Sequence, residues 1–496
     1  MTEKSSYKQI LKSTSLFGGV KVIQILATII RGKIVAVFLG TTGMGISSLL
    51  LSSTAMLQAI SGLGLSFSAV REISQANETG DTNKLNRTIT IFLKLLLFSS
   101  VSGALLLVVI SPLLSRFTFG TSDYIWEFVW LSTVVFMNTL SAGYQALMQG
   151  TRRLNDIAKT SVAGSILSIL TSFPIYYFWG IQGIVPAIII AAVTTFALNY
   201  FFFRKIKFKK IHLRINEVGI EGSEMFKLGF VMMIVGVLGT SVPFLINSFI
   251  QKTGNLSDVG LYQAGFSLTS QYVSLVFTAM TVDYFPRLSA IHSDNNKVRN
   301  LANQQSEIML LIVTPLIVTL ILVAPLLIKI FLSNEFIPIV NFIRLMSIGL
   351  LFQAGNHSMG LISFAKGDKK TFLVLAVVGN ASWLLFSIGG YKIGGLNGIG
   401  QMFVVHCIIS FIIVFVTVYH KYNYWMSRSF TRIFILGVGL AFSVYFIIWL
   451  SPNIYGYLFS SSILFFSIMY SIYELDKRVV LKELLSKFKE RYKNKR

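Results

Sequence analysis

The chain has 496 residues, of which 54% are hydrophobic and only 13% are charged, and its mean hydropathy is +0.69. A soluble domain is usually about 45–50% apolar, with about a quarter of its residues charged. The composition therefore excludes a water-soluble enzyme, a disordered chain and a secreted scaffold. It predicts an all-α integral membrane protein with about fourteen spans, because each span needs roughly 20 apolar residues.

Apolar segments separated by turn residues predict fourteen helices in chain order. Turn chemistry marks several boundaries, as at Gly394-Gly395 and Ser451-Pro452-Asn453. The start of the chain stays apolar well beyond the length of a signal peptide, so we expect a retained first helix. The expected helices span residues 11–39, 44–70, 89–111, 123–147, 157–178, 181–203, 223–250, 258–282, 306–332, 339–365, 371–391, 396–419, 430–450 and 453–473.

The net charge of +23 comes from 43 basic and 20 acidic residues, and the basic residues are unevenly placed. If both termini are cytoplasmic, the inner segments hold 33 basic residues, the outer loops hold 4 and the spans hold 6. Cytoplasmic loops of membrane proteins are enriched in Lys and Arg, so this bias predicts both termini in the cytoplasm. Since the bias accounts for most of the excess charge, we expect no nucleic-acid partner.

The sequence offers little for catalysis or cofactor binding. Cys407 is the single cysteine, and the five histidines are scattered. No H-E-x-x-H, Walker or G-x-S-x-G motif is present, and the predicted outer loops are too short for a catalytic domain. We therefore expect a transporter without catalytic residues, metal or cofactor.

An internal repeat relates helices 1–6 to helices 7–12. Gly45 and Gly260 are 215 residues apart, and Ile181-Gln182-Gly183-Ile184 matches Leu396-Asn397-Gly398-Ile399 at the same offset. An even number of spans per unit gives a parallel repeat, the arrangement of two-lobed transporters around a central cavity. The expected parts are an N-lobe at 1–203, a basic cytoplasmic linker at 204–222, a C-lobe at 223–419, two further helices at 420–473 and an amphipathic tail at 474–496.

Polar side chains follow one face of several predicted helices. In the first helix the face carries Lys21, Gln24, Thr28 and Arg31, spaced three or four residues apart. A polar group facing lipid is costly, so such a row indicates a wet cavity or hydrogen bonds between helices. For Ser and Thr alone, helix–helix bonding is the stronger interpretation. The other expected cavity-lining residues are Thr54, Gln58, Gln263, Ser270 and Ser274.

Basic residues within the spans favour an anionic substrate. Lys21, Arg31 and Arg344 are the best candidates for a cavity, against the alternatives of simple pairing or of snorkelling to the interface. Cations suit phosphate, and the planar guanidinium of Arg suits it best, so we expect a phosphate or diphosphate head group. Glu127 and Asp283 are the candidates for ion coupling.

Several motifs occur in a fixed order along the chain. They are Arg31-Gly32-Lys33-Ile34-Val35-Ala36 with Gly40-Thr41-Thr42-Gly43-Met44-Gly45, Ala146-Leu147-Met148-Gln149-Gly150 with Arg152, Val259-Gly260-Leu261-Tyr262-Gln263, Pro286-Arg287-Leu288-Ser289 and Leu332-Ser333-Asn334-Glu335-Phe336. Each is weak by itself, whereas the ordered set is specific. Over roughly residues 5–420 the set resembles the Wzx-type flippases of O-antigen and related polysaccharide repeat units.

The resemblance implies the multidrug/oligosaccharidyl-lipid/polysaccharide exporter fold in the bacterial inner membrane. It implies translocation of an undecaprenyl-diphosphate-linked oligosaccharide from the inner to the outer leaflet during lipopolysaccharide or related polysaccharide biosynthesis. It also suggests membrane lipids and the polysaccharide polymerase and chain-length machinery as partners. The two helices beyond twelve resemble those of the lipid II flippases, where the extra pair forms a groove for the lipid tail.

Two other functions compete with this interpretation. A cation-coupled multidrug exporter of the same fold is expected to carry buried carboxylates, whereas the first helix here offers Lys21 and Arg31. A polymerase or ligase of the same pathway needs a sizeable outer loop for its chemistry. The sites therefore favour the flippase over both alternatives.

Overall fold

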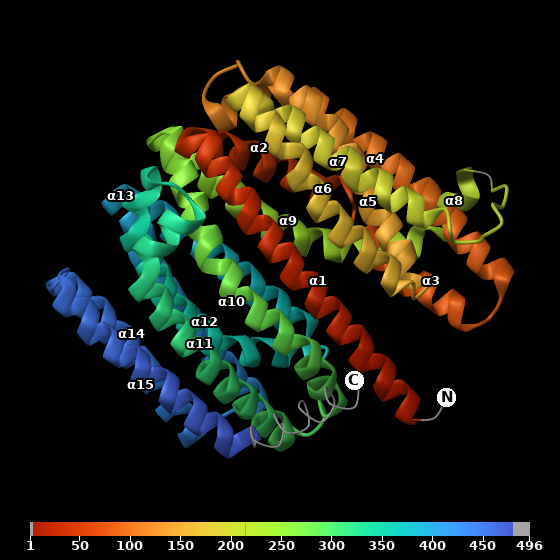
Figure 1. The fold of residues 1–496 in the computed structure, drawn as a ribbon. Helices are drawn as coiled ribbons and strands as arrows, with labels where there is room; N and C mark the ends of the chain where they lie inside the picture. The colour runs from red at the N-terminus through yellow and green to blue at the C-terminus, as the bar shows by residue number, and fades with distance from the viewer. Residues whose placement is uncertain (1–2, 214, 480–496) are drawn as a thin grey trace, which may run out of the picture. The chain divides into compact units, whose positions relative to one another are not determined.

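The computed structural model describes residues 3–213 and 215–479, and every regular element in these ranges is a helix (Figure 1). The helices form two compact units. Unit 1 comprises Met1–Ala264 with Phe331–Phe336, and unit 2 comprises Gly265–Ile330 with Ile337–Arg496. The expected all-helical fold is confirmed, whereas the lobe boundaries expected from the repeat stay a prediction.

Unit 1 begins with a long helix and ends within another. The helix α9 packs against α2 and α3 and so belongs to unit 1. The helices of this unit are α1 (Glu3–Phe38), α2 (Gly40–Ser61), α3 (Leu65–Glu78), α4 (Thr82–Phe119), α5 (Ile125–Gly150), α6 (Leu154–Trp179), η1 (Gly180–Gly183), α7 (Ile184–Phe203), α8 (Ile215–Glu221), α9 (Ser223–Thr253) and the first residues of α10 (Leu256–Ala290).

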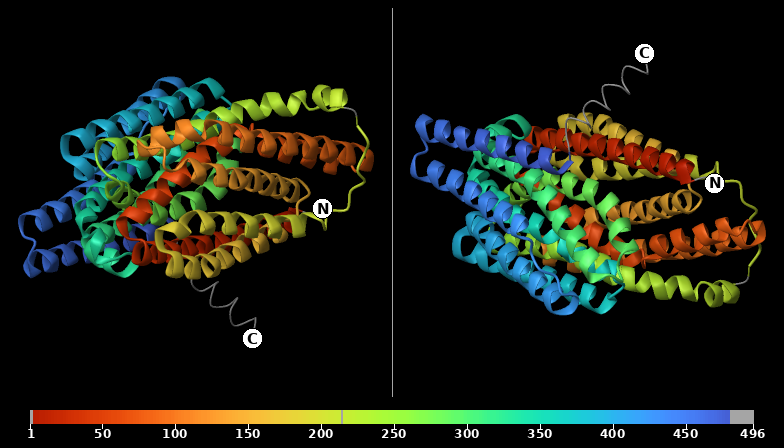
Figure 2. Two further views of the ribbon diagram at one scale, coloured as in Figure 1. Left: turned by 90° about the horizontal axis from the view of Figure 1, so that it is seen from above. Right: turned by 90° about the horizontal axis from the view of Figure 1, so that it is seen from below.

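Unit 2 is built around α12, which packs closely on α13. The remaining helices of this unit are α11 (Asn295–Phe331), α12 (Val340–Ala365), α13 (Lys369–Tyr422), α14 (Arg428–Leu450) and α15 (Ile454–Val479), and η2 (Asn334–Ile339) connects α11 to α12. Figure 2 shows α14 and α15 running side by side in both views, in agreement with their direct contacts. The rest of the expected amphipathic tail, residues 480–496, lies outside the described residues.

Backbone breaks divide some of the helices expected from the sequence. The span expected at 44–70 is interrupted after Ser61, where Leu63 and Gly64 adopt positive φ angles of 47° and 62°. Conversely, α13 runs through two expected spans and turns at Gly394 and Gly395, which are non-helical. Its first and last residues lie together, because Tyr422 donates a hydrogen bond to the Asp368 carboxylate at 2.8 Å. The element is therefore a hairpin of two helices.

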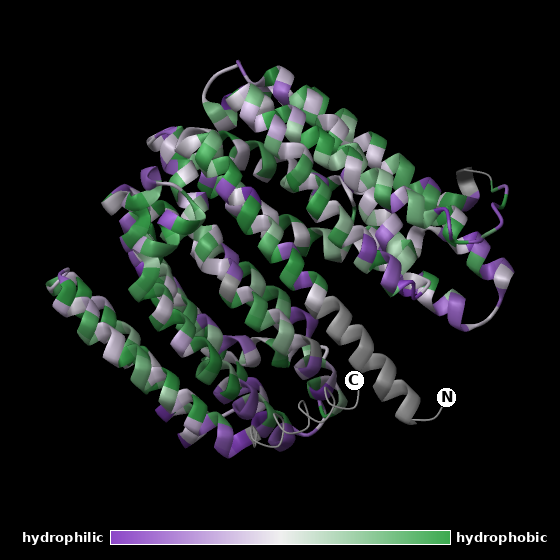
Figure 3. Cartoon of the chain, in the orientation of Figure 1, coloured by the Kyte–Doolittle hydropathy of each residue, from purple (hydrophilic) through white to green (hydrophobic). Residues whose placement is uncertain are grey.

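Ten helical segments of the described residues are long and apolar enough to cross a membrane. Figure 3 shows hydrophobic residues along the middle of α4 and hydrophilic ones at its ends and in the segment before α8. An apolar length of this kind matches a bilayer core of about 30 Å. The protein is therefore a multi-pass membrane protein, and the expected number of fourteen spans stays a prediction.

The linker between α7 and α8 is attached to α4. Its backbone N–H groups at Lys209 and Ile211 donate to Asn86 Oδ1 at 3.0 Å and to Thr90 Oγ1 at 3.3 Å. Its apolar side chains pack into the core of unit 1, whereas its lysines are exposed. A basic linker of this kind can lie in solvent or on anionic lipid head groups. In the structure, only the exposed lysines of the linker can contact solvent or lipid head groups.

Repeat-related residues meet where α2 and α10 cross in unit 1. The Ser257 hydroxyl donates to Thr41 Oγ1 at 2.8 Å, and the two residues are 216 positions apart. One turn further on, a Cβ at Gly45 would overlap the Leu256 carbonyl, and a Cβ at Gly260 would overlap the Thr41 carbonyl. Only glycine permits this approach of two backbones. The offset found in the sequence thus corresponds to a physical contact between repeat mates.

A polar cluster fastens the last two helices to α11 in unit 2. Arg478 Nε of α15 lies 3.0 Å from Glu307 Oε2, and its Nη1 lies 2.6 Å from Glu474 Oε2. Ser427 and Ser429 also donate to the Glu307 carboxylate, at 2.7 and 3.1 Å. A buried carboxylate with this many partners is well satisfied. This cluster holds α14 and α15 in place within unit 2.

Candidate functional site

A pocket of about 380 Å³ lies among α10, α12 and α13 in unit 2. The expected cavity residues Ser270 and Ser274 of α10 are on its wall, opposite side chains from the other two helices. Such a volume falls within the range of about 300–1,000 Å³ for small-ligand sites. The other lining residues are Phe266, Val273, Phe277, Met346, Leu350, Gln353, Leu375, Ala376, Gly379, Asn380, Trp383, Phe403 and His406.

The polar lining of this pocket contains no carboxylate, lysine or arginine. His406 Nδ1 lies 3.0 Å from the Ser382 hydroxyl, and the Trp383 ring meets Phe403 edge-on at 5.0 Å. Asn380 donates to the Ala376 carbonyl at 2.8 Å and keeps its amide oxygen as an acceptor. The pocket thus offers amides, hydroxyls and aromatic faces to a ligand.

The cationic row of α1 lies in unit 1. Lys21 and Thr28 are exposed, and Gln24 and Arg31 are half-buried. Neither Lys21 nor Arg31 takes part in any of the ion pairs found within the described ranges. Among the residues that the structure describes, the helix therefore presents one ammonium and one guanidinium group without a carboxylate partner. Such groups are available to an anionic ligand.

Arg344 lies at the start of α12 and contacts two neighbouring helices of unit 2. Its Nε donates to the Ile321 carbonyl of α11 at 3.1 Å, and its Nη2 donates to the Tyr457 hydroxyl of α15 at 3.0 Å. These bonds satisfy part of the guanidinium, which has five N–H donors in total. That Arg344 joins Lys21 and Arg31 around one head group stays a prediction, and a structural role between α11 and α15 is its rival.

Among the other expected cavity residues, one donates a hydrogen bond within its own helix and two are half-buried. The buried Thr54 hydroxyl donates to the Leu50 carbonyl at 3.0 Å, a common bond for threonine inside a helix. Gln58 of α2 and Gln263 of α10 are both half-buried. These positions carry no further indication of a ligand.

The two candidates for ion coupling differ in their surroundings. Asp283 is exposed at the end of α10 and pairs with Arg287, 3.2 Å away, one turn along the same helix. Glu127 lies in the first turn of α5, on the wall of a second pocket in unit 1. An exposed pair within one helix contributes little energy. Of the two carboxylates, Glu127 is therefore the one with a site around it.

Sequence reasoning did not assign Gln353, Asn380, Trp383 or His406 to a site. Asn380 has no polar neighbour three or four residues away, whereas Gln353 is followed at this spacing by Asn356 and His357, a row that was not assigned. The available signal was a polar residue within a predicted span, which also fits hydrogen bonding between helices. Within the described ranges, no group of three or more His, Cys, Asp and Glu side chains could hold a metal ion.

Comparison with known families decides where this all-helical chain belongs. A family model described as "Polysaccharide biosynthesis protein" matches residues 34–341, which is more than half of the chain. The chain belongs to this family. Two curated relatives of similar length are the lipid III flippases of Escherichia coli (strain K12) and Shigella flexneri. Each is 20% identical over 392 residues, which cover 78% of this chain and 93% of the relative.

Solved transporter structures share the fold. The lipid II flippase MurJ in an inward closed conformation matches with a TM-score of 0.72 and 14% identity, covering 95% of this chain and all of that one. An inward-facing multidrug transporter of the MATE family and MOP superfamily matches with a TM-score of 0.70 and 16% identity, covering 81% of this chain and 94% of that one. The fold is therefore that of the expected exporter superfamily.

Proposed function

We propose that the protein is a flippase for a lipid-linked oligosaccharide. Its substrate is an undecaprenyl-diphosphate-linked O-antigen or related repeat unit, which moves from the inner to the outer leaflet of the bacterial cytoplasmic membrane by alternating access. Membership of a polysaccharide biosynthesis family supports this function, as does the similarity to two lipid III flippases. The chain contributes no cofactor chemistry, because translocation makes and breaks no covalent bond.

The neutral pocket of unit 2 is the observation that carries the proposal. Sugar rings carry hydroxyls that both donate and accept hydrogen bonds, and they present apolar C–H faces to aromatic rings. The pocket supplies the complementary groups through Gln353, Asn380, His406 and the hydroxyls of α10, with Trp383 beside them. A drug cation would find no counter-charge among these groups, since the lining holds no negative charge.

The cations of α1 are proposed to hold the diphosphate of the same substrate. Arg31 suits a phosphate through two parallel N–H bonds, and Lys21 acts as a point charge. Arg344 is the third cation proposed for this group. The cytoplasmic position of both termini, coupling through Glu127 or Asp283, and partnership with the polymerase and chain-length machinery belong to the same proposal.

The test is the lipid-linked oligosaccharide profile of a strain without this gene. We expect the oligosaccharide to accumulate on the inner leaflet, and we expect the wild-type gene to clear it. A variant carrying Asn380→Ala and Gln353→Ala should fail to clear it at normal membrane levels. An unchanged profile in the deletion strain would overturn the proposal.

A cation-coupled multidrug exporter is the second candidate. The acidic pocket of unit 1, with Asp123 and Glu127 on its wall, is the observation that favours it, together with the MATE-like fold. This candidate predicts that the deletion strain becomes sensitive to cationic dyes while its lipid-linked oligosaccharides stay normal. The two profiles measured on one strain separate the two functions.

A further inference from the structure

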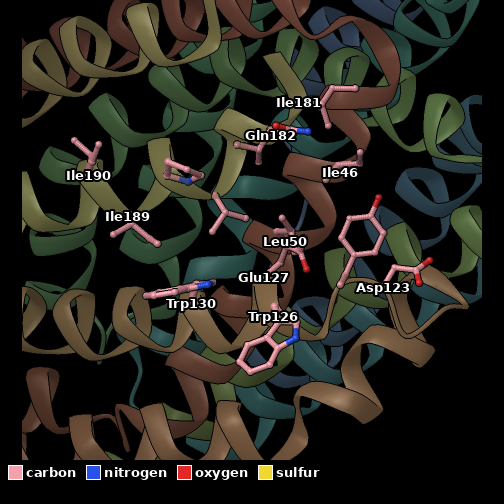
Figure 4. A pocket seen from close by; sticks show the side chains of 14 residues that line it. Ile46, Leu50, Asp123, Trp126, Glu127, Trp130, Ile181, Gln182, Ile189 and Ile190 are labelled. Atoms are coloured by element: carbon pink, nitrogen blue, oxygen red, sulfur yellow. The ribbon is translucent and has the colours of Figure 1, made fainter. Parts of the chain in front are cut away.

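A pocket of about 750 Å³ lies between α2, α5 and α7 at one end of unit 1. Figure 4 shows Trp126 and Trp130 on one side of it and Gln182 on the opposite side, with Glu127 and Leu50 between them. The two indoles are four residues apart on one face of α5 and are exposed. This pocket is separate from the neutral pocket, which belongs to unit 2.

The charge of this pocket is wholly negative. Its walls carry the carboxylates of Asp123 and Glu127, and none of its lining residues is basic. Glu127 Oε2 is buried and has no hydrogen-bond partner among the residues that the structure describes. Glu127 also gives no capping bond to the first turn of α5, whose N-cap is Tyr124 without a side-chain bond. Helix capping therefore does not account for the buried oxygen.

A buried carboxylate oxygen without a donor is costly, since each unpaired polar group loses its interaction with water. A ligand that removes this cost must bring hydrogen-bond donors or positive charge. Tryptophan faces attract cations, and quaternary or primary ammonium groups bind in sites that combine aromatic rings with carboxylates. A phosphate or carboxylate ligand would be repelled by Asp123 and Glu127.

We infer that this pocket binds an organic ammonium group, with Trp126 and Trp130 against its apolar face and Asp123 and Glu127 as its counter-charges. Two sources supply this chemistry in a membrane, an amino sugar on a transported oligosaccharide and the ethanolamine head group of a phospholipid. Binding of the ammonium group does not depend on the proposed flippase function, whereas the amino-sugar source rests on it.

Exposed tryptophans at a membrane interface have another well-known role, which is anchoring at the head-group level. Anchoring requires neither the two carboxylates nor the buried oxygen of Glu127. It also predicts that tryptophan fluorescence responds to lipid composition and not to soluble cations. The two roles therefore differ in a measurement on the purified protein.

The experiment titrates the full-length protein, in nanodiscs of phosphatidylglycerol, with choline and follows tryptophan fluorescence. The control ligand is 3,3-dimethylbutan-1-ol, which has the shape of choline without its charge. We expect saturable quenching by choline and none by the alcohol. Asp123→Asn with Glu127→Gln should weaken choline binding about ten- to hundredfold, the effect of losing a charge-assisted contact. The matched control is Glu78→Gln, which removes an exposed carboxylate of α3 outside the pocket lining and should leave binding unchanged.

Two further titrations separate the sources. Binding of glucosamine without binding of N-acetylglucosamine supports the amino sugar, since the two differ in the ammonium charge. Weaker choline binding in nanodiscs that contain phosphatidylethanolamine supports the lipid head group, because that lipid competes for the pocket. Equal quenching by choline and the neutral alcohol, or unchanged choline binding in the double variant with normal thermal unfolding, would overturn the inference.

Discussion

Arg31 is half-buried on α1, and its guanidinium forms no ion pair within the described residues. If it binds a phosphate, the contact contributes roughly 1.5–3 kcal/mol, so Arg31→Ala should slow export about ten- to hundredfold. Arg31→Lys should keep part of the activity, because the charge remains while the second N–H bond is lost. The measurement is the rate at which lipid-linked oligosaccharide reaches the outer leaflet, at equal membrane levels of protein.

The control for Arg31 is Arg71→Ala, which removes an exposed arginine of α3. Lys94 is unsuitable as a neutral control, because its Nζ donates to the Leu213 carbonyl at 2.6 Å and so helps to attach the linker. If Arg344 is structural, Arg344→Ala should lower the melting temperature, whereas Arg31→Ala should not. Normal export by Arg31→Ala would remove α1 from the proposed site.

At the scale of residues, the sequence indicated the cations of α1 as candidate binding residues. It could not distinguish hydroxyls that line a pocket from hydroxyls that are buried between helices. Thr54 and Ser274 are equivalent in a hydropathy pattern, and both hydroxyls donate within their own helices, yet Thr54 is buried and Ser274 lines a pocket. Which way a short polar side chain points depends on helix rotation, which packing determines. The same limit hid Asn380 and His406, since neither belongs to a row.

The crossing of α2 and α10 depends on two glycines. A methyl group at Gly45 would overlap the Leu256 carbonyl, so Gly45→Ala should force the helices apart. Overpacking typically costs about 1–3 kcal/mol, and we expect lower thermal stability together with weaker export. The matched control is Gly360→Ala in α12, where nothing lies within 4 Å of an added Cβ. That variant should be neutral or slightly stabilising, because alanine favours helices. Equal behaviour of the two variants would contradict the tight crossing.

Asp368 joins the two ends of the α13 hairpin. Its carboxylate accepts bonds from Thr371 N at 3.0 Å, Thr371 Oγ1 at 2.7 Å and Tyr422 Oη at 2.8 Å. These bonds, first of all those from Thr371, hold the pKa of Asp368 well below its ordinary value. A lowered pKa stabilises the fold above the ordinary value of about 4, and this stabilisation is lost as the pH falls toward the folded-state pKa.

Asp368→Asn should therefore lower the melting temperature at neutral pH. The difference in melting temperature between the variant and the wild type should become smaller when thermal unfolding is followed at pH values below about 4. Asp283→Asn serves as the comparison, because its exposed pair within one helix should change stability little at any pH. A difference in melting temperature that is independent of pH would show that the charge of Asp368 does not contribute to stability.

At the scale of elements, hydropathy located apolar helices but not the breaks within them. The sequence places one helix at 44–70, whereas the backbone turns at Leu63 and Gly64 and then continues as α3. A single Gly-Leu-Gly step within an apolar segment also fits an uninterrupted helix, so only the packed structure distinguishes the two. At Gly394-Gly395 two adjacent glycines gave a clear turn signal, and the turn is present.

For the whole molecule, the charge bias predicts which loops lie on which side of the membrane. Reporter fusions after residues 43, 120, 255 and 394 should report the outside, and fusions after 80, 155, 210 and 295 the cytoplasm. Fusion points 43 and 255 lie at the beginnings of α2 and α10, which meet through Thr41 and Ser257, so both should report the same side. Two or more reversed reporters would disprove the topology.

Composition and periodicity were sufficient to predict the fold class, because a bilayer permits few structures other than helices. The repeat predicts two related lobes at 1–203 and 223–419, and this division stays a prediction. The sequence could not predict how the cationic row of α1 lies relative to the pockets. That placement depends on how packed helices rotate and approach one another, and the order of residues does not determine it.

The contact between Thr41 and Ser257 has the form of an interface between two copies of one molecule. In a two-fold dimer, equivalent residues face each other across the axis, and a single substitution alters both sides at once. In this crossing each side likewise supplies one hydroxyl and one glycine, Thr41 with Gly45 and Ser257 with Gly260. Because the two sides supply the same groups, the two hydroxyl residues are interchangeable. Exchanging the pair, with Thr41→Ser and Ser257→Thr together, should therefore leave export unchanged.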